Sequence, residues 1–419
     1  MRAKRDNTIF KVCNRQGKFY AEKAGCTFEN RKGNLSMKQT KKGLLVAAAG
    51  WAMMLFSGVP SAWGVFRKAV CEEYGFAEQQ AAFVLNITVA AFGIGCLVGG
   101  YLQDKKGSFP ASILGSVLLS AGFLAAAFVP NESIWLFYLG FCLPAGLGCA
   151  FLYPAVMSCM QQANPDKKGL STGVAGLGFG LSGIVLTVIK QLTQPIWGVR
   201  GSFLTLSAAI AVICIGGSFL MRCPPTQQQK GLAPLQMVKT KNYWLVFLAV
   251  AFAAPSVLLF SPQIVELAQD RDLPEKIALW IVAAGAAANA VGRLSIPAIS
   301  DKIGRKQAAA AAMAALAGLS VWFGSAQGGW FFAGYCFLCF FYSGNAALLP
   351  SFCTDLFGMA WTGTNYGLAA LGMTAGSLLL IPAMVQILPQ GAEHWAAAAS
   401  CVVSLGCYTA LELKNSCKF

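Results

Sequence analysis

Charged residues are scarce in this chain. They make up 12% of its 419 residues, whereas a soluble globular domain has about 25%. Hydrophobic residues make up 56% of the chain, and many stand in long apolar runs that a surface in contact with water does not carry. These two features exclude an ordinary soluble domain and predict a polytopic membrane protein.

The usual signatures of catalysis and cofactor binding are missing as well. The chain has one histidine, His394, and its 15 cysteines show no C-x-x-C pair and no metal-ligand spacing, so we expect no metal. The stretch Gly178–Gly183 matches G-x-G-x-x-G, but no strand precedes it and we reject a dinucleotide site. No P-loop supports ATP-driven pumping. Since the apolar runs hold no nucleophile with its base, no paired carboxylates and no metal ligands, we expect neither an enzyme nor a cofactor.

Apolar windows of about 20 residues predict twelve transmembrane helices, and the alternating pattern of barrel strands is absent. The spans fall near 43–66, 80–101, 109–129, 134–159, 169–190, 201–221, 243–262, 277–299, 307–325, 330–353, 364–387 and 395–412. The fold class is therefore all-α and polytopic. The predicted parts are a basic, disordered tail 1–42, two six-helix halves 43–221 and 243–412, a polar linker 222–242 and a C-terminus 413–419.

The net charge of +15 is distributed unevenly. Most of the 32 basic residues lie in the N-terminal tail, the even-numbered loops and the C-terminus, whereas acidic residues show no such bias. This positive-inside pattern predicts a multi-pass protein of the plasma membrane, or of the inner membrane in a bacterium, with both termini cytoplasmic and the lipid bilayer around it. A nucleic-acid partner is rejected on the same ground. Met37 stands directly before a basic cluster and would make a natural start, so the presence of residues 1–36 in the native protein is left open.

The apolar span 277–299 carries one arginine, Arg293, eight residues before Asp301. At about 1.5 Å per residue, this places the guanidinium roughly 12 Å inside the membrane. A cation at that depth normally faces a polar cavity or a partner. We therefore expect an anion site there, although helix carbonyls or snorkelling could satisfy the arginine instead. Asn289 lies four residues earlier and hence on the same helix face.

Two loops repeat one motif. Asp104-Lys105-Lys106-Gly107 follows the second span, and Asp301-Lys302-Ile303-Gly304 follows the second span of the other half. The first copy, with Gly100 and Leu102 before it, resembles the signature loop of the major facilitator superfamily. The resemblance implies two pseudo-symmetric six-helix bundles around a central site that opens alternately to each side. It also implies a gating role for six residues, although the loops could serve only as topology determinants: Asp104, Lys105, Gly107, Asp301, Gly304 and Arg305.

Other stretches are similar to the oxalate/formate antiporter family. They are 165–173 with the glycines that follow, the pair Asn289 and Arg293, and Asn365-Tyr366-Gly367-Leu368. The resemblance, shared with the monocarboxylate transporters, implies that Arg293 holds a substrate carboxylate, for which a guanidinium fork is well suited. Oxalate-transporting members carry a lysine where this chain has Met373. One buried cation balances one carboxylate, so we expect a monocarboxylate such as pyruvate, lactate or formate rather than oxalate.

Several further residues are candidates for the walls of the pocket, and each has a plainer alternative. A phenol or amide inside a span can equally serve helix packing, and Trp63 can equally be an interfacial anchor. The remaining candidates for substrate binding are Tyr153, Tyr342, Asn345, Trp63, Asn86 and Met373.

These patterns predict a secondary active or facilitative carrier for a small organic anion. The related monocarboxylate carriers have an aspartate four residues before the arginine, whereas this chain has Asn289, so the usual proton carrier is missing. Exchange against a counter-anion or facilitated transport becomes more plausible than proton coupling, although a substrate can carry its own proton. An oxalate/formate-type dicarboxylate antiporter and a carrier-like receptor that binds without transport stay open. A channel is disfavoured because no pore loop is visible.

Overall fold

The computed structural model describes residues 43–226, 229–389 and 391–412. The predicted tails 1–42 and 413–419 lie outside the described residues. The disorder predicted for residues 1–42 therefore stays a prediction. The described residues from Val46 onward form one compact unit.

Helices make up almost all of the described chain. Its first half contains Gly43–Ser57, α2 (Val59–Tyr74), α3 (Glu78–Lys106), α4 (Ser108–Phe128), α5 (Ile134–Phe137), α6 (Leu143–Ala163), α7 (Lys168–Ile210) and α8 (Gly216–Ser218). Its second half contains α9 (Pro234–Val238), α10 (Lys241–Ala253), α11 (Pro255–Leu258), α12 (Ile264–Gln269), α13 (Glu275–Ile303), α14 (Arg305–Ser325), α15 (Gly328–Phe357), α16 (Thr362–Ala375), α17 (Ile381–Ile387) and α18 (Glu393–Thr409). Short π-helical segments join α5 to α6, α7 to α8 and α16 to α17. Outside the helices, the described chain forms one isolated antiparallel β-bridge, between Gly231 and Gly358.

The predicted spans agree with these helices. Nine helical stretches of the described chain are long and apolar enough to cross a membrane, and one of them, Pro165–Ser218, contains two predicted spans. That stretch bends at Gly198, whose φ of +67° is not helical. The two remaining predicted spans correspond to the shorter helix Gly43–Ser57 and to the 17 residues of α18. The all-α polytopic class is confirmed.

The first predicted span is broken rather than straight. Its helix ends at Ser57, Gly58 has a non-helical conformation with φ −92° and ψ 41°, and α2 then runs on to Tyr74. A proline at the start of a helix is well tolerated because the first N–H groups have no partner in the helix, and Pro60 occupies that position in α2. The predicted span therefore ends eight residues too early.

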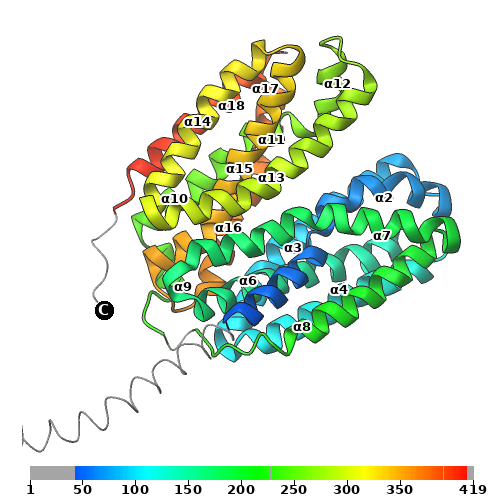
Figure 1. The fold of residues 1–419 in the computed structure, drawn as a ribbon, viewed down its shortest axis with the longest axis horizontal. Helices are drawn as coiled ribbons and strands as arrows, with labels where there is room; N and C mark the ends of the chain where they lie inside the picture. The colour runs from blue at the N-terminus through cyan, green and yellow to red at the C-terminus, as the bar shows by residue number, and fades with distance from the viewer. Residues whose placement is uncertain (1–42, 227–228, 390, 413–419) are drawn as a thin grey trace, which may run out of the picture. The chain divides into compact units, whose positions relative to one another are not determined.

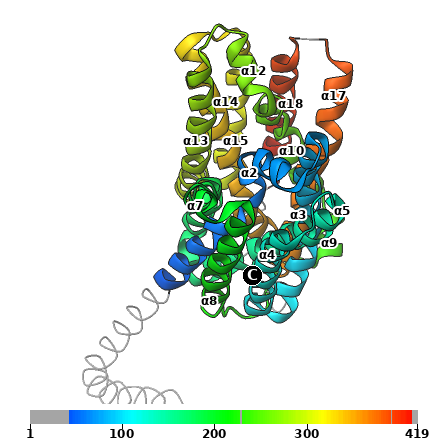
Figure 2. The same cartoon turned by 90° about the vertical axis from the view of Figure 1, so that its right-hand side faces the viewer.

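The described helices from Val46 onward lie in two groups (Figures 1 and 2). In the first group, α3 and α4 both pack on α6. In the second group, α15 packs on α13 and α14, and α14 also contacts α18. The groups meet where α7 lies along α13 and where α3 lies along α16. Both seams need glycine: a Cβ at Gly173 would lie 2.8 Å from the Leu294 carbonyl oxygen, and one at Gly367 would lie 2.9 Å from the Cys96 carbonyl oxygen. Glycine lets the helix backbones approach this closely.

Candidate functional site

Arg293 lies in the middle of α13, half-buried, on the side that faces α7. Its Nε donates a hydrogen bond of 3.0 Å to Oδ1 of Asn289, one helical turn earlier. Its guanidinium carbon lies 5.3 Å from the centre of the Phe179 ring of α7. Among the side chains that the structure describes, no carboxylate forms an ion pair with Arg293. The Asn289 amide holds one edge of the guanidinium, and the Tyr153 hydroxyl lies beside it as a further hydrogen-bond partner. Both groups are neutral, so neither balances the charge of the guanidinium.

Tyrosines from three other helices lie near the guanidinium. Arg293 interacts electrostatically with the phenols of Tyr153 in α6, Tyr342 in α15 and Tyr366 in α16. The rings of Tyr153 and Tyr366 stack across the two helix groups, with centroids 5.6 Å apart and 23° between their planes. Tyr153 also meets Phe179 edge-on at 5.2 Å. Both helix groups therefore contribute to one site centred on Arg293.

This arrangement suits a small anion that carries one charge. A cation in a span is costly unless it meets a partner, and the aromatic contact compensates only about 1–2 kcal/mol of that cost. A carboxylate would accept two parallel hydrogen bonds from the terminal nitrogens of the guanidinium, and phenol hydroxyls would add donors beside it. Aromatic rings would then enclose the apolar part of the ligand.

The predicted site residues separate into two sets. Arg293, Asn289, Tyr153 and Tyr342 come together as described above. Met373 lies half-buried in α16, two helical turns after Tyr366 and on the same face of that helix. Asn86 falls within α3, but its side chain lies outside the described part of the structure.

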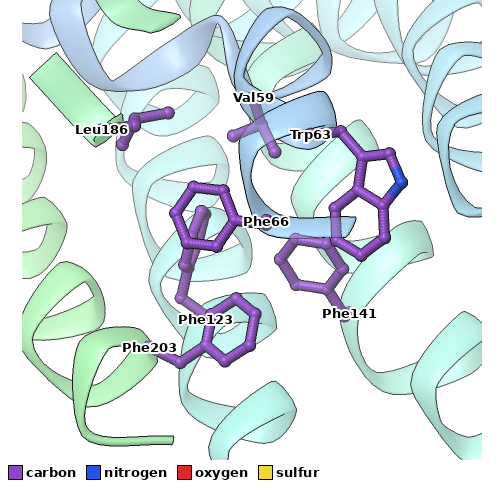
Figure 3. Close-up of a pocket in the computed structure, with 7 residues that line it drawn as sticks. All are labelled: Val59, Trp63, Phe66, Phe123, Phe141, Leu186 and Phe203. Carbon is purple, nitrogen blue, oxygen red and sulfur yellow. The ribbon is translucent and has the colours of Figure 1, made fainter. Parts of the chain in front are cut away.

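Trp63 does not join this site. Its indole Nε1 donates a 2.8 Å hydrogen bond to the carbonyl of Ala81, and its ring packs against Phe137 and Phe141 at 6.0 and 5.8 Å. Figure 3 shows the ring at the edge of a small apolar cavity of about 10 Å³ inside the first helix group. The prediction that Trp63 lines the substrate pocket is therefore corrected: the side chain is 4% exposed, and a neighbouring backbone carbonyl already satisfies its only donor.

Asn345 is also placed differently from the prediction. It is 3% exposed and lies against Tyr408 of α18, inside the second helix group. Asn345 follows Tyr342 by three positions in α15, but different helices cover α15 around its circumference, so the two side chains meet different neighbours. The structure therefore does not bring Asn345 to Arg293.

Sequence reasoning missed Phe179 and Tyr366 as neighbours of the arginine. Tyr366 belongs to the Asn365–Leu368 motif and precedes Met373 by seven residues, so helical spacing from Met373 could have singled it out. Nothing in the sequence distinguishes Phe179 from other phenylalanines in the spans, because its role comes from the packing of α7 on α13.

The loop residues Asp104 and Asp301 both accept hydrogen bonds at the start of a helix from the other group. Asp104 is fully buried and accepts from the backbone N–H of Gly363 at 2.9 Å and of Thr364 at 2.6 Å, where α16 begins. The Thr364 and Thr226 hydroxyls donate to it as well. Unpaired N–H groups and the helix dipole make such a helix start favourable for a carboxylate.

Asp301 occupies the corresponding place at the start of α7. It accepts from the N–H groups of Gly169 at 3.0 Å and Leu170 at 2.9 Å. Unlike Asp104, it also has a cationic partner, because Arg305 bridges it to Asp355, with 3.1 Å between Arg305 Nε and an Asp355 oxygen. The two helix groups are therefore joined by a matching pair of carboxylates at one end, hereafter the Asp104 end.

The other predicted loop residues have simpler surroundings. Gly107 and Gly304 end α3 and α13 with φ of +88° and +96°, a backbone region that favours glycine. Lys105 places its ammonium 4.5 Å from the centre of the Tyr101 ring. Among the described residues, no group of three or more histidine, cysteine or acidic side chains gathers as a metal ion would require.

Known proteins resemble the chain over most of its length. The sequence pattern of the family described as "Major Facilitator Superfamily" matches residues 43–381. The oxalate:formate antiporter of Oxalobacter formigenes is 26% identical over 328 residues, which cover 75% of this chain and 77% of that protein. The uncharacterized transporter YhjX of Escherichia coli is 24% identical over 333 residues, covering 75% and 81%. Human monocarboxylate transporter 11 is 27% identical over 268 residues, covering 62% and 56%.

Solved structures share the fold at low sequence identity. The transporter FucP, crystallised in the outward conformation, superposes with a TM-score of 0.69 at 12% identity, covering 88% of this chain and 99% of FucP. A bacterial homologue of the iron transporter ferroportin gives a TM-score of 0.66 at 16% identity, covering 88% and 98%. The helices of the present chain, the family pattern that matches residues 43–381 and the fold of these solved structures agree. The chain belongs to the major facilitator superfamily of membrane transporters.

Proposed function

We propose that this protein is a carrier for a small organic anion, specifically a monocarboxylate of the pyruvate, lactate or formate kind. The observation that supports this best is Arg293: a half-buried cation in a membrane span, held by Asn289, with no acidic partner among the described side chains. A bound carboxylate would supply the missing negative charge.

Each neighbour has a defined part in this proposal. Asn289 orients the guanidinium so that its two terminal nitrogens face the ligand. Tyr153 and Tyr342 donate hydroxyl hydrogens to the carboxylate or to a keto or hydroxy oxygen beside it. Phe179 covers the opposite face of the guanidinium, and Met373 leaves the α16 side of the pocket neutral.

Transport would proceed by alternating access between the halves 43–221 and 243–412. We assign the Asp104 end to the cytoplasm, with both termini there, because the positive-inside pattern favours that orientation. The hydrogen bonds of Asp104 and Asp301 then hold the cytoplasmic side closed, and their loss would accompany opening toward the cytoplasm.

The coupling follows from Asn289. An amide does not titrate, so it cannot deliver a proton to the site as an aspartate would. We therefore propose exchange against a second anion, or facilitated transport, over proton symport.

The test is uptake of labelled pyruvate, lactate, formate and oxalate into proteoliposomes, with and without internal anion and across a proton gradient. Wild-type protein should carry monocarboxylates, and Arg293→Lys should lose most of this uptake because lysine keeps the charge but not the fork. Normal uptake by Arg293→Lys would contradict two-point binding. Stimulation by an inward proton gradient would contradict the proposed coupling.

A dicarboxylate antiporter is the second candidate, because one relative bears the name oxalate:formate antiporter. Oxalate carries two charges, whereas Met373 leaves the site with one cation, so the second carboxylate would lack a partner. Oxalate uptake as fast as formate uptake in the same assay would favour this candidate. Saturable binding without uptake of any anion would instead indicate a receptor.

A further inference from the structure

The polar linker between the two halves is attached to both of them at the Asp104 end. Besides α9, which packs on α10 and α16, two of its pieces make contacts there, Cys223–Thr226 and Gln229–Leu232. The first piece contacts α3 and α4: the Ser108 N–H donates to the Cys223 carbonyl at 3.2 Å, and Gln103 Nε2 lies 3.5 Å from the Thr226 hydroxyl.

The second piece contacts the turn that leads into α16. The Lys230 carbonyl accepts from the N–H groups of Met359 and Ala360 at 3.0 and 3.2 Å. Leu232 donates its N–H to the Phe357 carbonyl at 2.8 Å, and its own carbonyl accepts from Asn365 Nδ2 at 3.0 Å. These bonds hold the turn that presents Gly363 and Thr364 to Asp104.

Thr226 connects the linker to that carboxylate directly. Its side chain is fully buried, and its hydroxyl donates to the Asp104 oxygen that also accepts from Gly363. Among the described side chains, Asp104 has no lysine or arginine partner. Its charge therefore depends on N–H and hydroxyl donors, and a buried carboxylate that loses one of them is destabilised by the unmet hydrogen bond.

The corresponding carboxylate is stabilised differently. Asp301 has Arg305 beside it, and Arg305 and Lys168 both pair with Asp355, with the lysine at 3.4 Å. No linker residue among those described takes part there. The two carboxylates therefore differ in their additional partner. Asp104 has the hydroxyl of Thr226 from the linker, whereas Asp301 has the guanidinium of Arg305.

We propose that these two pieces of the linker act as a clamp, and that Thr226 is the positioning residue through which the clamp stabilises the state closed at the Asp104 end. The inference rests on the alternating access proposed above. Separation of Asp104 from Gly363 and Thr364 would break the bonds within this cluster, so the linker must release one of the halves when that end opens. Its contacts then bias the equilibrium between the two states of the carrier, without touching the substrate.

The test compares Thr226→Val, which keeps the shape but removes the hydroxyl, with Thr226→Ser, which keeps the hydroxyl. Loss of a hydrogen bond to a buried charge corresponds to a shift of about tenfold or more in the equilibrium between states. In proteoliposomes of known orientation, Thr226→Val should lower the half-saturation concentration for labelled pyruvate at the Asp104 end by about tenfold and raise it at the other end. Thr226→Ser should resemble the wild type at both ends.

A second readout needs no substrate. The Lys230 carbonyl is hydrogen-bonded to Met359 and Ala360, and we expect trypsin to cleave after Lys230 faster once these bonds are released. Purified Thr226→Val in lipid nanodiscs should therefore be cleaved there faster than the wild type or Thr226→Ser. Asn365→Leu removes the bond to the Leu232 carbonyl but leaves Thr226 in place, and it should also accelerate cleavage.

The outcomes separate the clamp from the transport function. Faster cleavage of Thr226→Val and Asn365→Leu, with no anion transported by the wild type, would support the clamp and refute the proposed function. Equal cleavage of all four proteins would overturn the clamp even if pyruvate is transported. The Thr226→Val variant could also yield less active protein while the ratio of its two half-saturation concentrations stays at the wild-type value. This result would overturn the clamp as well, because a residue with a merely structural role would produce it.

Discussion

Replacement of Asn289 by aspartate should convert the proposed carrier into one that depends on protons. The amide accepts the Nε hydrogen of Arg293 at 3.0 Å, and aspartate is close to it in size and shape. The substitution therefore places a negative charge beside the guanidinium with little change in packing. The carboxylate would neutralise the cation that is proposed to attract the substrate.

The size of the effect follows from the distance between the charges. Two unit charges about 4 Å apart, at an effective dielectric constant of about 20, interact by about 4 kcal/mol. Desolvation of the new carboxylate cancels part of this energy. A net loss of about 2 kcal/mol in anion binding corresponds to roughly a 30-fold weaker affinity at neutral pH.

The pH dependence has a defined sign. While it is charged, the introduced carboxylate pairs with Arg293 and competes with the substrate anion for the guanidinium. Protonation removes the competing charge, so a bound anion and the protonated form of the introduced carboxyl favour one another and binding takes up a proton. Acidification should therefore restore anion affinity toward the wild-type value, and an inward proton gradient should drive uptake.

The assay is uptake of labelled pyruvate into proteoliposomes at neutral and acidic pH. Asn289→Ala is the matched control, because it removes the hydrogen-bond acceptor without adding a charge and should stay insensitive to pH. If Asn289→Asp takes up pyruvate like the wild type at neutral pH and gains no proton dependence, Arg293 is not the substrate cation.

Three further predictions concern specificity, packing and the helix seams. Met373→Lys adds a second cation on the face of α16 that carries Tyr366, and uptake of labelled oxalate should increase relative to formate, whereas Met373→Leu should change neither. Trp63→Ala leaves a cavity in a packed aromatic cluster and should lower the free energy of unfolding by about 3–5 kcal/mol, measured by denaturation in detergent. The half-saturation concentration for pyruvate should stay unchanged, and a change in it would indicate that Trp63 belongs to the substrate site. Gly367→Ala places a Cβ 2.9 Å from the Cys96 carbonyl oxygen and should lower the melting temperature, whereas Gly318→Ala has no atom within 4 Å of the new carbon and should not.

The sequence determined most of the fold because membrane spans are encoded locally. A hydrocarbon layer requires about 20 apolar residues per helix, so the spans can be counted from hydropathy alone. The predicted spans agree with the helices of the described chain, except that the first span is broken at Gly58 and continues to Tyr74. The repeated Asp104 and Asp301 loops also indicated the duplication, since a repeat is visible in one dimension.

The site was only partly visible in the sequence. Asn289 and Arg293 are one helical turn apart, so their contact follows from the geometry of a single helix. Tyr153 and Tyr342 stand on other helices, and their approach to Arg293 required the packing of α6 and α15 around α13. The same limit explains the failures: Trp63 and Asn345 have suitable chemistry, but their helix faces meet other neighbours.

Sequence alone thus determined which residues can share a helix face, that the chain is an all-α membrane protein and which apolar helix carries a costly cation. Only the tertiary structure decided which faces meet. It brought Phe179 and Tyr366 to Arg293, closed Trp63 into an aromatic cluster and set Thr226 of the linker against Asp104. The physical reason is that helix periodicity is a property of neighbouring residues along the chain, whereas contacts such as Tyr153 with Tyr366 depend on the close approach of distant helices that glycines at the seams permit.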